Sequence, residues 1–270
     1  MELNLPIEEC IKELGRYVLP ICFHYGKTRS PFFIGSGIPI VFNDELYFAT
    51  AAHVVDGAGE KQMWIAGNSA FIPLKGPQIR WKHISGSRPD YDLVVYKLEE
   101  NDRKSIEPFY GFITEADVSV VDDPDQYTLF GFVGYPHSKN KSKPISPEEQ
   151  VNFTSLFYLM NKLVPLNELK VKDKEQNVHF ALKAPNKKAV SLDMQSKQPL
   201  ISPIGISGCP VFRIQLDPNA GIVKHAHLVG LGIEHDKSQQ VFIATRSEWV
   251  FYSVDQLAKK LKAVQGTPAT

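Results

Sequence analysis

The feature that most limits the possible folds of this chain is a succession of short apolar runs, each broken by glycine, proline, asparagine or aspartate. The runs are FFIGSGIPIVF, ELYFATAAHVV, YDLVVYKL, YTLFGFVGYP, CPVFRI, HLVGLGI and QVFIATR. Their lengths and apolar spacing are typical of β-strands, and no helical pattern of about 10 to 15 residues separates them. We therefore predict a mainly β protein with antiparallel strands in a barrel or sandwich, and not a parallel α/β sheet.

Amphipathic helices are expected at both ends of the chain. Over residues 6–16 the apolar positions recur at helical spacing, with acidic residues early and basic residues late. Near the other end, Ser253 and Gln256 match a capping box, and an apolar face follows as far as Gly266. The segment 146–163 leaves helix and strand both open, because it combines a helix-entry signal with aromatic and β-branched residues.

Charge and cysteine content limit the classes of function. Lys plus Arg and Asp plus Glu number 30 each, so no overall field attracts nucleic acid or an anionic membrane, and we expect neither as a partner. The lysine-rich pieces at 139–143 and 170–174 are expected to be solvated. No apolar run reaches the roughly 18 to 20 residues that span a bilayer, and the first residues lack the order of a secretory signal. With only three cysteines and no disulfide framework, we expect a cytoplasmic protein.

Two motifs carry candidates for a catalytic base and for the acid that orients it. In FATAAHVV, His53 follows an apolar strand at a point where its ring can face a cleft. In DYDLVVYKL, Asp92 stands directly before an apolar strand, so its carboxylate can hold the Nδ1 proton of a neighbouring imidazole. Asp90 is the alternative acid, but its place after Pro89 is typical of a turn.

A third motif, PIGISGCPVF at 203–212, carries a candidate nucleophile and is the most specific of the three. Ser207 lies between Gly205 and Gly208, and glycine permits the torsions that turn consecutive N–H groups toward one point. We predict that the N–H groups of Gly205 and Ser207 form an oxyanion hole for acyl transfer. A plain turn before a strand is the alternative interpretation of this motif taken alone.

Together the three motifs resemble those of the trypsin-like (chymotrypsin-fold) serine peptidases, which carry T-A-A-H, an aspartate at a strand start and G-x-S-G-x-P in this order. The resemblance implies two antiparallel six-stranded β-barrels with an N-terminal and a C-terminal helix. It also implies a serine endopeptidase without a cofactor, with His53 as general base, Asp92 as orienting acid and Ser207 as nucleophile. The implied domains are a helix at 1–17, a first barrel at 18–115 with His and Asp, a second barrel at 116–250 with Ser and the oxyanion hole, and a helix and tail at 251–270.

Departures from the secreted members of that family bear on activation. Val54 follows His53 where those enzymes usually have cysteine, in keeping with a reduced protein. Ile206 stands where members activated from zymogens have an aspartate that pairs with a new N-terminal amine, so that route is not expected. Cys209 replaces the second glycine after the serine. A cysteine nucleophile is disfavoured because Ser207 holds that position, and an α/β-hydrolase elbow because its last glycine is missing.

Substrate preference is less constrained. The resemblance implies a specificity pocket with Ile201, Gly232, Glu234 and His235 around it. Ile201 stands where trypsin has an aspartate, so a simple preference for Lys or Arg is not supported, whereas Glu234 or His235 could give polar selectivity or be solvated. The expected partners are a protein or peptide substrate and a regulatory protein.

One other function competes with a peptidase: a catalytically silent or partner-activated scaffold that binds a protein or peptide. A metal site formed by His225, His227 and His235 with Cys209 is not expected, because no ligand spacing fits. The sequence does not identify the natural substrate, the activating signal or the oligomeric state.

Overall fold

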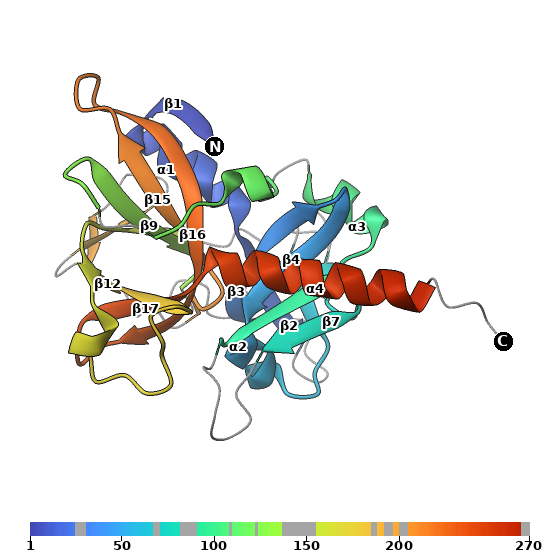
Figure 1. Cartoon of the computed structure of the whole chain (residues 1–270). Coiled ribbons are helices and arrows are strands. Elements are labelled where there is room, and N and C mark those ends of the chain that lie inside the picture. Colours follow the sequence, from blue (N-terminus) through green and yellow to red (C-terminus); the bar gives the residue numbers. More distant parts are fainter. Residues whose placement is uncertain are drawn as a thin grey trace.

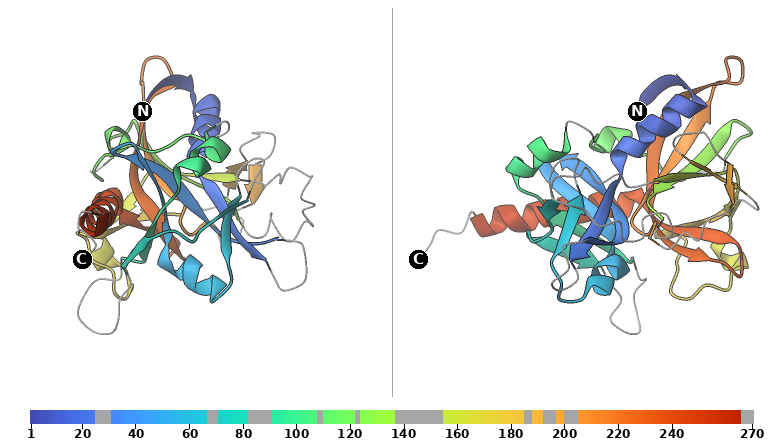
Figure 2. Two further views of the ribbon diagram at one scale, coloured as in Figure 1. Left: turned by 90° about the vertical axis from the view of Figure 1, so that its right-hand side faces the viewer. Right: turned by 180° about the vertical axis from the view of Figure 1, so that it is seen from behind.

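The computed structural model describes residues 1–24, 31–66, 71–81, 91–107, 110–121, 124–136, 155–184, 188–191, 197–199 and 205–265. Within these residues the chain forms two curled antiparallel sheets side by side, with four α-helices around them (Figures 1 and 2). The predicted fold class, mainly β with two antiparallel units and a helix near each end, is confirmed. The lysine-rich piece at 139–143 lies outside the described residues.

The first sheet has seven strands in the order β6-β5-β2-β3-β4-β8-β7. Its strands are β2 (Leu19–His24), β3 (Pro31–Phe42), β4 (Glu45–Ala51), β5 (Met63–Ala66), β6 (Phe71–Pro73), β7 (Gln78–Trp81) and β8 (Leu93–Lys97). The β3–β4 hairpin closes on Asn43 and Asp44, whose φ values of 50° and 62° match the two-residue turns that suit twisted strands. This turn sends β4 back through the core, and β4 leads directly into the helix that carries His53.

The second sheet has ten strands, with β11-β12-β17-β16-β15-β9-β10-β13-β14 in order and β1 paired to β16. They are β1 (Glu2–Pro6), β9 (Thr128–Gly134), β10 (Leu156–Met160), β11 (Leu163–Val164), β12 (His179–Lys183), β13 (Lys188–Ser191), β14 (Lys197–Pro199), β15 (Pro210–Leu216), β16 (Ile222–Asp236) and β17 (Val241–Arg246). Short edge strands bring both sheets above the six strands expected for each. The segment 146–163, left open by its sequence, contains strand β10.

The helices are α1 (Ile7–Leu14), α2 (Ala52–Ala58), α3 (Glu100–Ile106) and α4 (Ser247–Gln265), with short 3₁₀ turns at Gly15–Tyr17, Glu115–Asp117 and Leu166–Glu168. The amphipathic helix expected at 6–16 is confirmed, and Gly15 is its C-cap. The predicted capping box at Ser253 is wrong. α4 begins six residues earlier, and the Ser253 hydroxyl donates a hydrogen bond to the Trp249 carbonyl one turn back.

Both sheets and α4 contribute to one hydrophobic core. Phe33, Tyr47, Phe212, Leu231 and Val250 are buried in the same cluster, and they come from β3, β4, β15, β16 and α4. α4 packs against β7 and β8 of the first sheet and against β16 and β17 of the second (Figure 1). None of the helices described has the length and apolarity that crossing a membrane requires.

Candidate active site

His53 is held at the start of a short helix that ends a buried strand. β4 is buried from Leu46 to Ala51, and the chain turns into α2 at Ala52. This arrangement fixes the backbone of His53 while leaving its side chain 45% exposed at the edge of the first sheet. The ring is therefore anchored at its base and open to solvent at its tip.

Asp92 contacts the first turn of α2 through three of its oxygen atoms. Its Oδ2 lies 2.5 Å from Nδ1 of His53, and its Oδ1 accepts a hydrogen bond of 2.8 Å from the His53 backbone N–H. Its carbonyl accepts a third, of 3.0 Å, from the Ala52 N–H. Ala51, the N-cap residue, provides no side-chain cap, so Asp92 satisfies the N–H groups at the helix start. One carboxylate thus fixes both the backbone and the ring of His53.

The backbone at Asp92 allows these contacts because it adopts a left-handed conformation. Its φ is 44°, a value that aspartate tolerates better than most residues, and its side chain is 12% exposed. The residue stands just before β8, as the sequence predicts. Asp90, the alternative acid, lies outside the described residues.

The loop that carries Ser207 is bound to strand β3 of the first sheet. The Ser36 N–H donates a hydrogen bond of 2.9 Å to the Ser207 carbonyl. A Cβ on Gly35 would lie 2.6 Å from Cγ1 of Val54 and 3.2 Å from the Ser207 carbonyl oxygen. Gly35 therefore lies directly between the side chain of Val54, which follows His53, and the backbone of Ser207, and a larger residue would not fit there. The structure brings the His53 helix and the Ser207 loop together at the seam between the sheets.

Ser36 joins this loop to both sheets, a role that its sequence context did not reveal. Its hydroxyl is fully buried, donates to the Gly205 carbonyl over 3.4 Å and accepts from the Tyr135 N–H over 3.3 Å. Its carbonyl accepts a hydrogen bond of 2.7 Å from the Thr50 hydroxyl, three residues before His53. The GSG motif was the available signal, but a serine between glycines in a strand does not indicate partners that are distant in the sequence.

The torsions of the Ser207 loop require its glycines. Gly205 and Gly208 have φ values of 97° and 84°, a region that L side chains rarely adopt. A Cβ on Gly208 would lie 2.0 Å from the Ser36 carbonyl oxygen and 2.3 Å from the Thr50 hydroxyl, so only glycine fits against β3 and β4. Within 205–210 Ser207 alone is partly exposed. The other residues of the loop are therefore buried, and Ser207 is left partly exposed to solvent.

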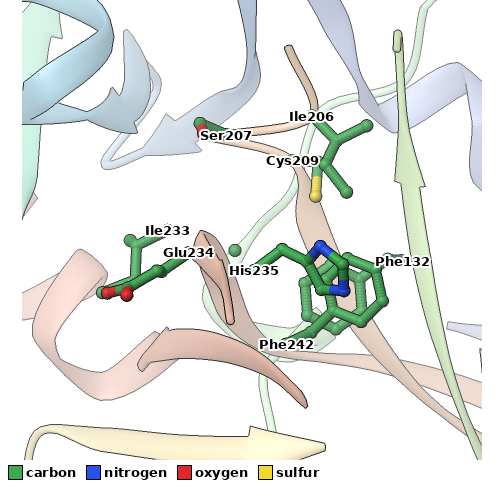
Figure 3. Close-up of a pocket in the computed structure, with 9 residues that line it drawn as sticks. Phe132, Ile206, Ser207, Cys209, Ile233, Glu234, His235 and Phe242 are labelled. Atoms are coloured by element: carbon green, nitrogen blue, oxygen red, sulfur yellow. The ribbon is translucent and has the colours of Figure 1, made fainter. Parts of the chain in front are cut away.

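A pocket opens beside Ser207 between this loop and the end of β16 (Figure 3). It is lined by three residues of the expected specificity pocket, Gly232, Glu234 and His235, while Ile201 lies outside the described residues. Phe132 and Phe242 also line it and were not predicted, because they come from β9 and β17.

Cys209 lines the same pocket but is poorly suited to act as a nucleophile. Its side chain is fully buried, and burial raises the pKa of its thiol above the ordinary value. Within the described part of the chain no group of three or more His, Cys, Asp or Glu is arranged to hold a metal ion. The rings of His225 and His227 lie 6.1 Å apart on β16.

Comparisons with known proteins find likeness in structure only. No family model matches the chain, and no curated protein matches its sequence. The HtrA-type protease AlgW with a tripeptide is 15% identical over 92% of this chain and 62% of that chain, with a TM-score of 0.49. An inactive serine-to-alanine mutant of Rv3671c from M. tuberculosis is 12% identical over 99% and 94%, with a TM-score of 0.45. The MamO protease domain from Magnetospirillum magneticum is 15% identical over 89% and 96%, with a TM-score of 0.44.

Proposed function

We propose that this chain is a trypsin-like serine endopeptidase that cleaves peptide bonds through an acyl-enzyme. His53 is the general base, Asp92 orients it, and Ser207 is the nucleophile. The observation that carries the proposal is the 2.5 Å contact between His53 Nδ1 and Asp92 Oδ2. It lies next to a loop that depends on two glycines with positive φ and that leaves Ser207 partly exposed. In this proposal residues 18–115 hold the base and the acid, and residues 116–250 hold the nucleophile.

The chemistry follows from the position of the proton on His53. Because the Asp92 carboxylate accepts a hydrogen bond from Nδ1–H, the neutral ring keeps its proton on Nδ1, and Nε2 can take one from the Ser207 hydroxyl as the serine oxygen attacks the substrate carbonyl carbon. The N–H groups of Gly205 and Ser207 stabilise the resulting oxyanion. His53 then protonates the leaving amine, and a water molecule activated by the same nitrogen hydrolyses the ester to release the acid and restore Ser207.

A reducing compartment, the cytoplasm, fits the cysteines. All three thiols are free and buried, and none is paired. Ile206 is also buried, 4% exposed, in the position where an activating aspartate would stand in zymogen-activated relatives. We therefore propose that a partner protein controls the activity, and we do not propose activation by a new N-terminal amine.

Labelling with a fluorophosphonate tests the proposed function. The folded wild type is expected to gain one phosphonyl group on Ser207, located by peptide mass mapping, and Ser207→Ala and His53→Ala are expected to gain none. Ser253→Ala is the matched control, since it removes a buried hydroxyl within α4 and is expected to label like the wild type. A folded wild type that is not labelled would favour the alternative, a silent or partner-activated scaffold that binds protein or peptide.

A further inference from the structure

The pocket beside Ser207 is closed at its inner end by aromatic rings and a thiol. A Cβ on Gly232 would lie 2.6 Å from Cε1 of Phe132 and 3.0 Å from Sγ of Cys209, so the floor is packed against the strand. The rings of Phe132 and Phe242 lie 4.9 Å apart and leave no channel between them. A side chain that enters from Ser207 therefore meets apolar atoms after a short distance.

The polar residues at the pocket do not offer a charge to its interior. The ring of His235 stacks on Phe242 with centroids 4.5 Å apart, and its buried Nδ1 has no hydrogen-bond partner among the residues that the structure describes. Burial, assisted by Lys237 and opposed by Asp236, lowers the pKa of His235, which favours its uncharged imidazole. The Glu234 side chain is 48% exposed, lies 3.6 Å from the Lys174 ammonium group, and points away from Phe132 and Phe242 (Figure 3).

The pocket beside Ser207 also has little room for a substrate side chain. The pocket encloses about 210 Å³ of empty volume when the open solvent at its mouth is included, so the enclosed part next to the aromatic floor is smaller than that. Because Phe132, Phe242 and Cys209 close this end, a long side chain such as lysine, glutamate or phenylalanine has no room to extend past them.

We propose, on the basis of the proposed function, that this pocket selects peptide substrates with a short, uncharged, apolar side chain, from alanine to valine in size, on the residue whose carbonyl Ser207 attacks. Phe132 is the residue that sets the limit on size, because its ring forms the floor. The pocket selects by excluding other side chains: a long one does not fit, and a charged one loses its water without gaining a partner inside the pocket from the described residues that line it.

Peptidyl phosphonates that differ only in this side chain test the proposal on the wild-type protein. Second-order rates of Ser207 labelling are expected to be highest for alanine and valine, and at least about tenfold lower for phenylalanine, lysine and glutamate, given what one methylene is worth in such pockets. A faster rate for any of those three, or no reaction of the alanine and valine probes with a protein that the small fluorophosphonate does label, would overturn it.

Variants of two phenylalanines test whether Phe132 sets the size of the largest side chain that the pocket accepts. Phe132→Ala is expected to raise the rates of the leucine and phenylalanine probes at least about tenfold relative to alanine, because it removes the floor. Phe130→Ala is the control: Phe130 lies two residues earlier on β9 and is equally buried, but it does not line the pocket. Phe132→Leu is the milder change if the alanine variant does not fold, and an unchanged order of rates in a folded Phe132 variant contradicts the role of this ring. Failure of the small fluorophosphonate itself would instead contradict the proposed function.

Discussion

Asp92 is the residue on which most of the site depends, because one side chain both caps α2 and contacts the His53 ring. Asp92→Asn keeps an oxygen for the His53 backbone N–H, so the helix start can persist. Its amide also presents a donor to Nδ1, however, which leaves the proton on Nε2, where it prevents removal of the serine proton. We expect turnover of a peptide substrate to fall roughly 10⁴-fold with little change in melting temperature.

The matched control for Asp92→Asn is Asp56→Asn, which removes a carboxylate from the same helix where it pairs with Arg80. That pair is partly exposed, so we expect near wild-type turnover from the control. An Asp92→Asn protein that is folded and retains more than about a tenth of wild-type turnover would contradict the proposed role of Asp92, given the size of the effect in a known Ser-His-Asp triad.

Ser36 is a positioning residue, since its hydroxyl contacts the Gly205 carbonyl and the Tyr135 N–H and does not contact a reacting atom. Ser36→Ala leaves both of those buried groups without this partner, at a cost of about 1 to 3 kcal/mol for each unsatisfied group. Because the lost bond holds the Ser207 loop, we expect kcat to fall about tenfold while KM changes less than twofold.

Steady-state kinetics on Ser36→Ala and Ser253→Ala separate positioning from general stability. Both serines are buried and donate to a carbonyl, but the partner of Ser253 lies within α4. Equal losses of kcat in the two variants would show that Ser36 acts on stability alone.

At the scale of elements, the site depends on the fit of the Ser207 loop against β3 and β4. Gly208→Ala adds a Cβ at a φ of 84° and in contact with the Ser36 carbonyl, so the loop must move away from β3. Gly221→Ala adds the same strain at a φ of 66° where nothing lies within 4 Å. We expect the first variant to lose most fluorophosphonate labelling and the second to keep it, with only about 1 kcal/mol of destabilisation from the backbone.

Denaturant unfolding together with labelling rates checks this pair of glycine variants. If Gly208→Ala labels as fast as Gly221→Ala, the close contact with β3 is not what orients Ser207. If Gly221→Ala is the more destabilised of the two, backbone strain outweighs the steric clash with β3.

Elements that depend on local pattern could be predicted, and those that depend on distant partners could not. The apolar run before His53 and the strand after Asp92 appear as β4 and β8, because their periodicity is read within a few residues. By contrast, β1 has partly exposed residues and forms a strand through its pairing with β16. Ser36 meets Gly205 across 169 residues of sequence, and the pocket ring Phe132 comes from β9, so neither role was visible locally.

At the scale of the whole molecule, the two sheets contribute to a shared hydrophobic cluster, and the three cysteines are buried at different places in the interior. Burial raises the pKa of Cys10 and Cys22 to about 12, and Glu13 adds to the effect at Cys10. The folded-state pKa of a thiol thus lies above the ordinary value of about 8.5, so near pH 8 the native protein carries almost no thiolate.

We therefore expect the three thiols to resist a thiol reagent near pH 8 in the native state and all three to react in denaturant. Rapid reaction of one thiol in the native protein would show that its part of the core is open. The same raised pKa values affect stability: unfolding lets the thiols ionise above about pH 8.5, so their contribution is fully present below that pH and is lost as pH rises toward the folded value.

The most direct test of His53, Asp92 and Ser207 as a catalytic unit is the mass of the intact protein during turnover of an activated ester. We expect a burst of about one leaving group per chain and an acyl adduct that peptide mapping locates on Ser207, absent in His53→Ala and Ser207→Ala. A folded wild type that shows no burst and no adduct, or an adduct on any other residue, would contradict the assignment of His53, Asp92 and Ser207 as a catalytic unit.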